Sequence, residues 1–250
     1  MKKLNKLFSL ILPLLTIAFL LVVWSIVAKT YDNEYIVPTI ESTIKEMAKL
    51  FGEKKFYIAL GQTMLRSVIA FLLSFLISAI LAYCSVKSLK AEKLILPLIS
   101  ITRTLPTLAI AWLLLFWTNS QIAPVVITML VVLPTSYTHI KGALESVNKN
   151  TIDAGKVDGA GLINLFFNIE LPQIAPDLFN VTGSGLALNL KLMVAAEVLS
   201  ATLKSLGNMI NLATPFEVAR VLAITVVVLV LGLVIEFLFN KLSKLASSWR

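Results

Sequence analysis

Long runs of apolar residues alternate with short polar segments along the chain. Residues 7–28 and 67–86 carry no formal charge and match the roughly 20 residues that an α-helix needs to cross a bilayer. A third uncharged stretch, 104–140, is interrupted by TNSQ (118–121) and then Pro124, which predicts two spans joined by a tight turn. Two later runs, 177–200 and 218–240, contain a few ionisable residues but are otherwise apolar. The pattern predicts an all-α membrane protein with six transmembrane helices.

Composition supports a lipid environment. Apolar residues make up 58% of the 250 residues and charged residues 14%, with a mean hydropathy of +0.88, whereas soluble domains average about 25% charged residues. The net charge of +8 would suggest nucleic acid as a partner of a soluble protein. Here the basic residues flank the apolar runs, so we expect the bilayer and no nucleic acid as the partner. The single cysteine, Cys84, excludes an internal disulfide.

The distribution of basic residues predicts the orientation of the six spans. Six crossings leave both termini on one side, and lysine and arginine are enriched in cytoplasmic segments. With the N-terminus inside, the inner segments hold Lys2, Lys3, Lys6, Lys87, Lys90, Lys93, Lys141, Lys149, Lys156, Lys241, Lys244 and Arg250. The outer segments hold only Lys29, Lys45, Lys49, Lys54, Lys55 and Lys204. We therefore predict one domain, 1–250, with cytoplasmic termini, an external loop at 29–65 and a cytoplasmic loop at 141–172.

The external loop is expected to contain one short helix. In VPTIESTIKEMAKLFG (37–52), apolar residues recur at helical spacing, Thr39 can cap the N-terminus and Gly52 can end the helix. Glu41 and Lys45 form an i, i+4 pair on the polar side. This helix is expected to pack on the spans or lie at the membrane surface.

The cytoplasmic loop contains the unusually polar segment DAGKVDGAGLINLFFNIELP (153–172). Asn150 and Asp153 predict a helix start, with the carboxylate near the positive helix end. Gly159 and Gly161 can end this helix by adopting positive φ. A second short apolar helix, 162–169, is then expected to stop at Pro172. The segment thus predicts two helices joined by a glycine corner.

The spacing within this segment resembles the cytoplasmic coupling loop, or EAA loop, of permease subunits of bacterial binding-protein-dependent ABC importers. An acidic residue and alanine are followed by glycine at the seventh position and by Ile-x-Leu-Pro at positions 17 to 20. Asp153 stands where the family usually has glutamate, and Gly155 where it has alanine. The resemblance assigns coupling to the ATPase to Asp153, Ala154, Gly155, Asp158, Gly159, Gly161, Ile169, Leu171 and Pro172.

Other segments extend the resemblance over nearly the whole chain. VPTIEST (37–43) is similar to the family's outer proline-led helix, and RTLPTLA (103–109) to its Arg-x-x-Pro segment. AAEVLSATLKSLGNMI (195–210) and the terminal SSWR (247–250) also fit. Together they most resemble the branch that serves nitrate, sulfonate, taurine and some thiamine-precursor or other heterocycle importers.

The resemblance implies a transport subunit of the bacterial inner membrane rather than an enzyme. The chain has no G-x-x-x-x-G-K-[ST] phosphate-binding motif, so ATP and Mg²⁺ are expected in separate subunits. The expected complex contains two permease chains, as a homodimer, two ATP-binding subunits and an external substrate-binding protein. The alternative is an ion-gradient-driven secondary transporter or channel, which predicts internal repeats. No such repeats are evident in the sequence.

A few ionisable residues inside the predicted spans are candidate functional groups. Lys191 and Glu197 point about 120° apart on an ideal helix and are not expected to pair. Glu197 is interpreted as a gate or as a structural bond to another helix near the outer end, and Lys191 as a possible pathway residue. Arg103, with Pro106, is interpreted as a kinked span entry or a substrate contact. Gly183 and Gly185 predict close helix packing, or else a dimer interface or pathway lining.

Overall fold

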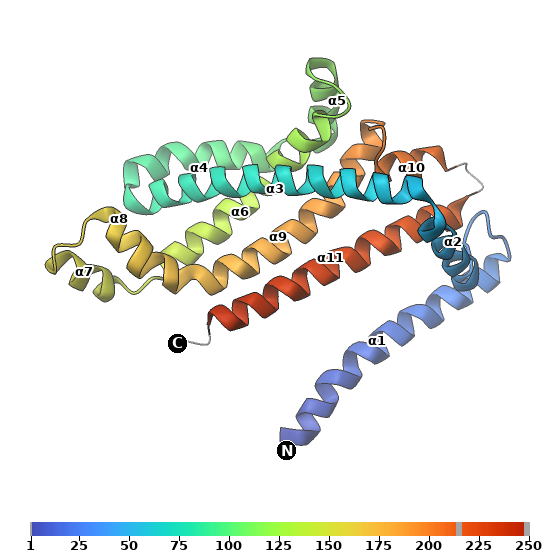
Figure 1. Cartoon of the computed structure of the whole chain (residues 1–250), viewed down its shortest axis with the longest axis horizontal. Coiled ribbons are helices and arrows are strands. Elements are labelled where there is room, and N and C mark those ends of the chain that lie inside the picture. Colours follow the sequence, from blue (N-terminus) through green and yellow to red (C-terminus); the bar gives the residue numbers. More distant parts are fainter. Residues whose placement is uncertain (1, 214–216, 248–250) are drawn as a thin grey trace.

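The computed structural model describes residues 2–213 and 217–247, with side chains from residue 11 onward, so residues 248–250 of the C-terminal SSWR lie outside it. All regular structure in the described residues is helical (Figure 1). The elements are α1 (Lys2–Tyr31), α2 (Ile40–Gly52), α3 (Lys54–Lys87), α4 (Leu89–Thr104), α5 (Thr107–Trp117), α6 (Ala123–Glu145), α7 (Lys149–Val157), α8 (Leu162–Leu165), the π-helical turn η1 (Phe166–Glu170), α9 (Leu171–Leu199), α10 (Leu206–Leu212) and α11 (Val218–Ala246).

The long helices lie roughly along one axis, with short helices at both ends. Figure 1 shows α7 and α8 at one end, here named the loop end, and α2 and α10 at the other, named the α10 end. Five helices in the described residues are long and apolar enough to cross a membrane, or six if the bent pair α4 and α5 counts as one. The predicted all-helical, multi-span fold is therefore confirmed.

The third span differs from its prediction. The expected span beginning at Thr104 is wrong, because α4 ends at Thr104 and α5 leaves it at an angle of 94°. Pro106 lacks a backbone N–H and drives Leu105 into an extended conformation, with φ −62° and ψ 130°. The 11 residues of α5 span only about 16 Å. Most of this crossing is therefore supplied by α4.

The second half of the 141–172 loop continues into α9 as one helical path. Pro172 was expected to end the second loop helix, and this prediction is wrong, because α8, η1 and α9 form one helical segment over 162–199. The N–H of Leu171 donates to the carbonyl of Phe166, five residues back. This wider π turn shifts the hydrogen-bond register just where a proline would clash with an ordinary α-helix.

Small side chains bring the central helices close together. On α3, the hydroxyls of Ser74 and Ser78 donate to the carbonyl oxygens of Met129 and Leu133 on α6, at 3.0 and 2.8 Å. A β-carbon on Gly183 of α9 would stand 2.5 Å from Cβ of Phe239 on α11. One on Gly185 would stand 2.8 Å from the ring of Phe71 on α3. The predicted close packing at Gly183 and Gly185 is confirmed within one chain.

The helix predicted within residues 37–52 is confirmed as α2. The hydroxyl of Thr39 accepts a hydrogen bond from the N–H of Ser42, and Glu41 and Lys45 pair at 2.7 Å. Beyond Gly52, α3 begins already at Lys54, well before the apolar run at 67. At the junction, both guanidinium nitrogens of Arg220 donate to Glu53, at 2.9 and 2.7 Å, and these bonds lower the pKa of the Glu53 carboxyl.

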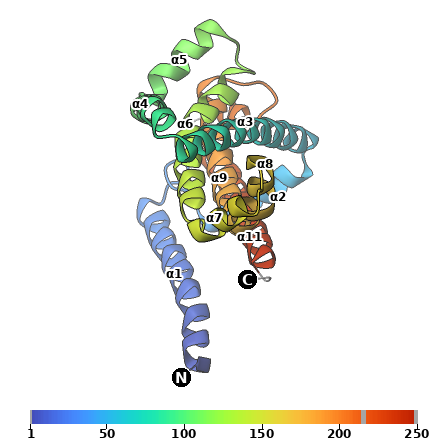
Figure 2. The ribbon, with the colours of Figure 1, turned by 90° about the vertical axis from the view of Figure 1, so that its left-hand side faces the viewer.

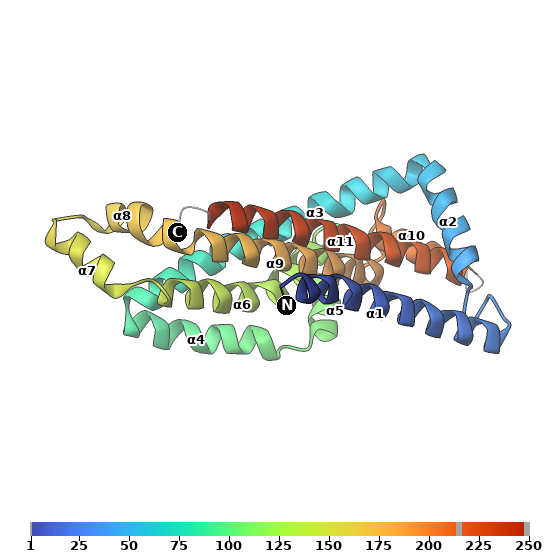
Figure 3. The ribbon, with the colours of Figure 1, turned by 90° about the horizontal axis from the view of Figure 1, so that it is seen from below.

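Helix α1 stands apart from the other helices in Figures 1 and 2, and Figure 3 shows that it runs along the same direction as the long helices. A hydrogen bond of 2.9 Å links Nε1 of Trp24 to the carbonyl of Pro38, just before α2. Most of the described side chains of α1 are apolar and exposed, Phe19 by 65%. The core of the chain is consequently formed by α3, α6, α9 and α11, with α2, α4 and α10 packed against them.

Candidate functional site

The first loop helix, α7, begins earlier than predicted. The side-chain oxygen of Asn148 accepts from the N–H of Asn150 at 2.9 Å, so Asn148 is the N-cap. The predicted start at Asn150 is therefore wrong, because Asn148 supplies the cap, and Asp153 lies a full turn beyond the first residue of α7. Asp153 is exposed and instead pairs with Lys156 at 2.9 Å.

A glycine corner ends α7. Gly159 has φ +79°, as predicted, and its N–H donates to the carbonyl of Lys156. The N–H of Ala160 donates to the carbonyl of Gly155. These two bonds form a Schellman motif, which satisfies the last carbonyls of a helix. Gly161 was also expected at positive φ, and this is wrong, because it has φ −69° and opens α8 as its N-cap.

The motif glycine at 155 lets the two arms of the loop touch. Gly155 is buried, and a β-carbon there would stand 2.7 Å from Cδ1 of Ile169 and 2.8 Å from Cδ2 of Leu165. In this chain, glycine at 155, where the family usually has alanine, therefore leaves room for Ile169 and Leu165 to pack closely on α7. The structure brings Gly155 and Ile169 together, while Ala154 and Asp158 are exposed and Leu171 and Pro172 lie in the first turn of α9.

Glu170, within the Ile-Glu-Leu-Pro part of the motif, was missed by the sequence analysis. Its buried carboxylate forms an ion pair with Lys87 at the end of α3. The ammonium of Lys87 lies 5.1 Å from the ring centroid of Tyr83, and that ring packs edge-on against Phe166 at 5.2 Å. The base of the loop is thus fastened to α3 by charge and by aromatic packing.

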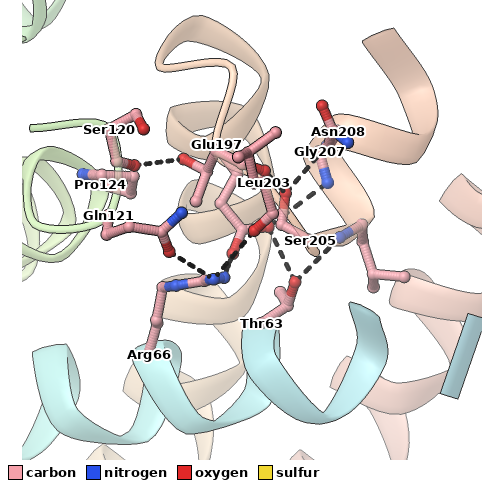
Figure 4. Close-up of polar contacts among 12 residues, drawn as sticks. Thr63, Arg66, Ser120, Gln121, Pro124, Glu197, Leu203, Ser205, Gly207 and Asn208 are labelled. Atoms are coloured by element: carbon pink, nitrogen blue, oxygen red, sulfur yellow. Dashed lines mark hydrogen bonds and ion pairs between the residues drawn. The ribbon is translucent and has the colours of Figure 1, made fainter. Parts of the chain in front are cut away.

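A second cluster of buried polar groups lies toward the α10 end, around Glu197 (Figure 4). One carboxylate oxygen of Glu197 accepts from Nη1 of Arg66 at 2.7 Å. The other accepts from the hydroxyl of Thr63 at 2.8 Å and from the N–H of Gly207 at 3.3 Å. Nη2 of Arg66 also donates to Oε1 of Gln121 at 2.9 Å. Glu197 therefore binds α9 to α3 and α10, which is the structural bond considered for it.

Arg66 escaped the sequence analysis because the apolar run of its span starts only at 67. Its helix begins at Lys54, so the guanidinium lies several turns inside α3 and is 8% exposed. The sequence did contain a signal for this pair: Arg66 lies directly before the apolar run at 67–86, and Glu197 lies inside the later run at 177–200. The structure also confirms that Lys191 does not pair with Glu197.

Gly207 makes this cluster possible, and its replacement should disrupt it. A β-carbon there would lie 2.5 Å from Cβ of Glu197 and 2.6 Å from the backbone nitrogen of Val198. Because backbone atoms cannot move aside, we expect Gly207→Ala to destabilise the protein by about 1–3 kcal/mol, measured by thermal unfolding in detergent. The control is Gly52→Ala, since a β-carbon there would meet nothing within 4 Å. Equal stability of the two variants would contradict the packing described for Gly207.

The remaining candidates, Lys191 and Arg103, lie on the surface of the single chain. Within residues 2–213 and 217–247, Lys191 forms no ion pair or hydrogen bond, and its side chain is exposed. Nη2 of Arg103 donates to the hydroxyl of Thr138 on α6 at 2.8 Å. The kink predicted at Arg103 and Pro106 is confirmed by the bend between α4 and α5. These two cations therefore form no common site with Glu197.

Comparisons with known proteins match most of the chain. The family model of binding-protein-dependent transport system inner membrane components matches residues 74–247. The formylaminopyrimidine transport permease protein ThiX of Halalkalibacterium halodurans is 25% identical over 242 residues, which is 95% of each chain. A chain from inward-facing conformations of the MetNI methionine ABC transporter matches with a TM-score of 0.67 and 16% identity, over 78% of this chain and 99% of that one.

A second solved structure gives the same picture. An amino acid ABC transporter with histidines matches with a TM-score of 0.59 and 18% identity, over 76% of this chain and 92% of that one. At these identities the two solved structures demonstrate a shared fold.

Proposed function

We propose, on the premise that this chain belongs to the family of binding-protein-dependent transport system inner membrane components, that residues 149–172 transmit the movement of separate ATPase subunits to its spans. The chain is a multi-pass permease component of an ABC importer. The family match does not favour the alternative of an ion-gradient-driven carrier or channel. The observation that carries this proposal is the loop at the end of the bundle, whose two arms pack together and are joined to α3 by an ion pair.

The tip of this loop has the character of a docking surface. Four large apolar side chains on α7, α8 and η1 are exposed. Their exposed fractions are 88% for Val157, 69% for Leu162, 74% for Ile163 and 59% for Phe167. Such a concentration of exposed apolar surface is typical of a binding site for another protein. A groove on an ATPase subunit is the partner that fits this family.

The construction of the loop supports mechanical coupling. The Schellman corner, the contact of Gly155 with Ile169 and the ion pair of Glu170 with Lys87 hold its parts together. Residues 162–199 then continue as one helical segment to the Glu197 cluster. A push on α7 and α8 would therefore be carried along α9 to the opposite end of the permease.

The proposed complex contains two copies of this chain, two ATP-binding subunits and an external substrate-binding protein. It would lie in the inner membrane of a bacterium with both termini and the loop end in the cytoplasm, as the basic residues favour. ATP and Mg²⁺ would bind only in the ATPase subunits, because the chain has no phosphate-binding motif of its own.

The proposed cargo belongs to the branch of nitrate, sulfonate, taurine and thiamine-precursor or other heterocycle importers. The named relative, a formylaminopyrimidine transport permease protein, is similar over 95% of the chain and supports a heterocyclic cargo within that branch. Identifying the ligand of the cognate binding protein would decide between a heterocycle and a small oxyanion.

Co-purification tests the proposed function. In mild detergent, a separate ATPase subunit should elute with this chain, and vesicles holding the complex should take up cargo only with ATP. A chain that elutes alone and takes up cargo into ATP-free vesicles under an ion gradient would be a secondary transporter.

Cysteine labelling tests the orientation. Glu41 lies on α2 and Ala154 on α7, at opposite ends of the bundle, and both are exposed. In a Cys84→Ser background, Glu41→Cys should react with an impermeant thiol reagent in whole cells, and Ala154→Cys should react only after lysis. The reverse pattern would place the loop outside the cell and remove the coupling proposal.

A further inference from the structure

One face of α9 differs from the exposed faces of the long helices α1, α3 and α11. Its exposed residues recur every three or four positions and so form a single stripe along the helix. They are Asp177, Asn180, Ser184, Leu188, Lys191, Ala195 and Leu199. On α11, by contrast, the exposed stripe includes Leu229, Leu233 and Phe237. The stripe of α9 is therefore polar at Asp177, Asn180, Ser184 and Lys191, although the helix is long and apolar enough to span a membrane.

A matching polar face lies on α6, next to α9. The exposed residues in this half of α6 are Thr135, Thr138, His139, Gly142 and Glu145, and Glu145 pairs with Lys141. Between the two helices is a groove of about 450 Å³, whose lining includes His139, Ser146, Asp177, Asn180 and Ser184. This volume lies in the range of sites for small molecules. The hydrogen bond to Thr138 also places the guanidinium of Arg103 beside this face.

Contact with lipid does not account for this arrangement. Ionisable side chains within membrane spans face the protein interior or water, because hydrocarbon solvates them poorly. The other long helices meet this condition, since leucine, isoleucine and phenylalanine dominate their exposed faces. The face shared by α6 and α9 must therefore meet water or protein in the assembled complex.

We propose that this α6–α9 face lines a water-filled path for a small polar solute, and that Lys191 is the fixed positive charge within it. The inference rests on the proposed function and adds to it the lining of the path and its charge preference. Lys191 lies 14 residues beyond Asp177, about 21 Å along the helix. Anionic and neutral solutes would pass the ammonium more readily than cations.

The surroundings of Lys191 leave its charge available to a solute. The one carboxylate nearby in sequence, Glu197, is held by Arg66 at 2.7 Å. The Cε atom of Lys191 lies 3.8 Å from the position of a β-carbon on Gly232 of α11, so the aliphatic part rests against that glycine. The aliphatic part of the side chain is therefore packed, and the ammonium lies at the edge of the stripe.

Accessibility to a charged reagent tests the path. In a Cys84→Ser background, inside-out vesicles with the assembled complex would be treated with a cationic, impermeant methanethiosulfonate, both without nucleotide and with ATP and vanadate. We expect Asn180→Cys and Ser184→Cys to react on the order of 100-fold faster than Phe237→Cys in at least one state, since only a hydrated thiol ionises. Phe237 is 68% exposed and lies at similar depth, because its neighbour Phe239 packs on Gly183.

Equal, slow reaction of all three cysteines in both states would overturn the path, and would mean that lipid or a second copy covers the stripe. Co-purification of the ATPase from the same vesicles distinguishes a failure of the path from a failure of the proposed function. Loss of the ATPase would refute the proposed function, whereas a bound ATPase with unreactive cysteines would refute only the path.

The charge preference has its own test. Ala195 lies one turn beyond Lys191 on the same stripe, so Ala195→Cys would report the local potential. The ratio of reaction rates with anionic and cationic methanethiosulfonates, normalised to a free thiol, should fall at least about fivefold when Lys191→Gln is added, from Coulomb's law in water at roughly 8 Å. Lys241→Gln, the same change on α11, should leave the ratio unaltered. An unchanged ratio with Lys191→Gln would refute the role of Lys191.

Discussion

Gly159→Val should give a protein that inserts at near-normal levels but no longer binds its ATPase subunits. Gly159 has φ +79°, and a β-branched side chain there costs on the order of 1–2 kcal/mol. A β-carbon would meet no atom within 4 Å, so the cost comes from the backbone alone. Relief of this strain would swing α7 away from α8. ATPase co-purification and ATP-driven uptake should fall about tenfold or more.

Two control variants separate backbone strain from a general effect of the loop. Gly161→Val adds the same side chain two residues later, where φ is −69°, and should retain most of the uptake. Gly159→Asn should be milder than Gly159→Val, because asparagine tolerates positive φ. If Gly159→Val keeps full uptake with the ATPase bound, residues 153–172 are only a connecting loop.

Arg66→Met should be among the most destabilising single substitutions in the chain. It would leave the carboxylate of Glu197, which is 0% exposed, without its cation. Loss of one partner from a buried ion pair costs about 3–5 kcal/mol. The expected result is a large fall in the thermal unfolding midpoint in detergent and in the yield of assembled complex.

The matched control is Arg220→Met, which breaks the partly exposed pair with Glu53 and should cost about 1 kcal/mol or less. Adding Glu197→Gln to Arg66→Met should restore part of the stability, because no uncompensated charge remains. If Arg66→Met proves no worse than Arg220→Met, the ion pair with Glu197 does not hold α3 to α9.

Much of the fold follows from the apolar pattern of the sequence. Where the prediction from this pattern was wrong, the cause is local. The runs at 7–28 and 218–240 coincide with α1 and α11 because both are almost purely apolar. Helix α4 was missed because Lys90, Glu92 and Lys93 occupy its first turns. Pro172 was interpreted as a stop because a sequence does not reveal the π turn that accommodates it.

The features of the candidate site likewise divide into those that the sequence predicts and those that it does not. Positive φ at Gly159 was predictable, because the spacing within a contiguous motif is local information. The pairing of Arg66 with Glu197 was not, since 131 residues separate them and only the packing of α3 on α9 brings them together. The stripe on α9 required the burial of each residue, because Asp177, Asn180 and Ser184 lie among apolar neighbours in the sequence.

The most direct test of the coupling proposal is photo-cross-linking from the tip of the loop. Leu162 is 69% exposed there and would be replaced by a photo-cross-linking amino acid in the assembled complex, with Leu233 of α11 as the control position. The account predicts a covalent product between position 162 and the ATPase subunit, and none from position 233. Products from position 162 with lipid or with the permease alone, in a complex that still hydrolyses ATP, would contradict it.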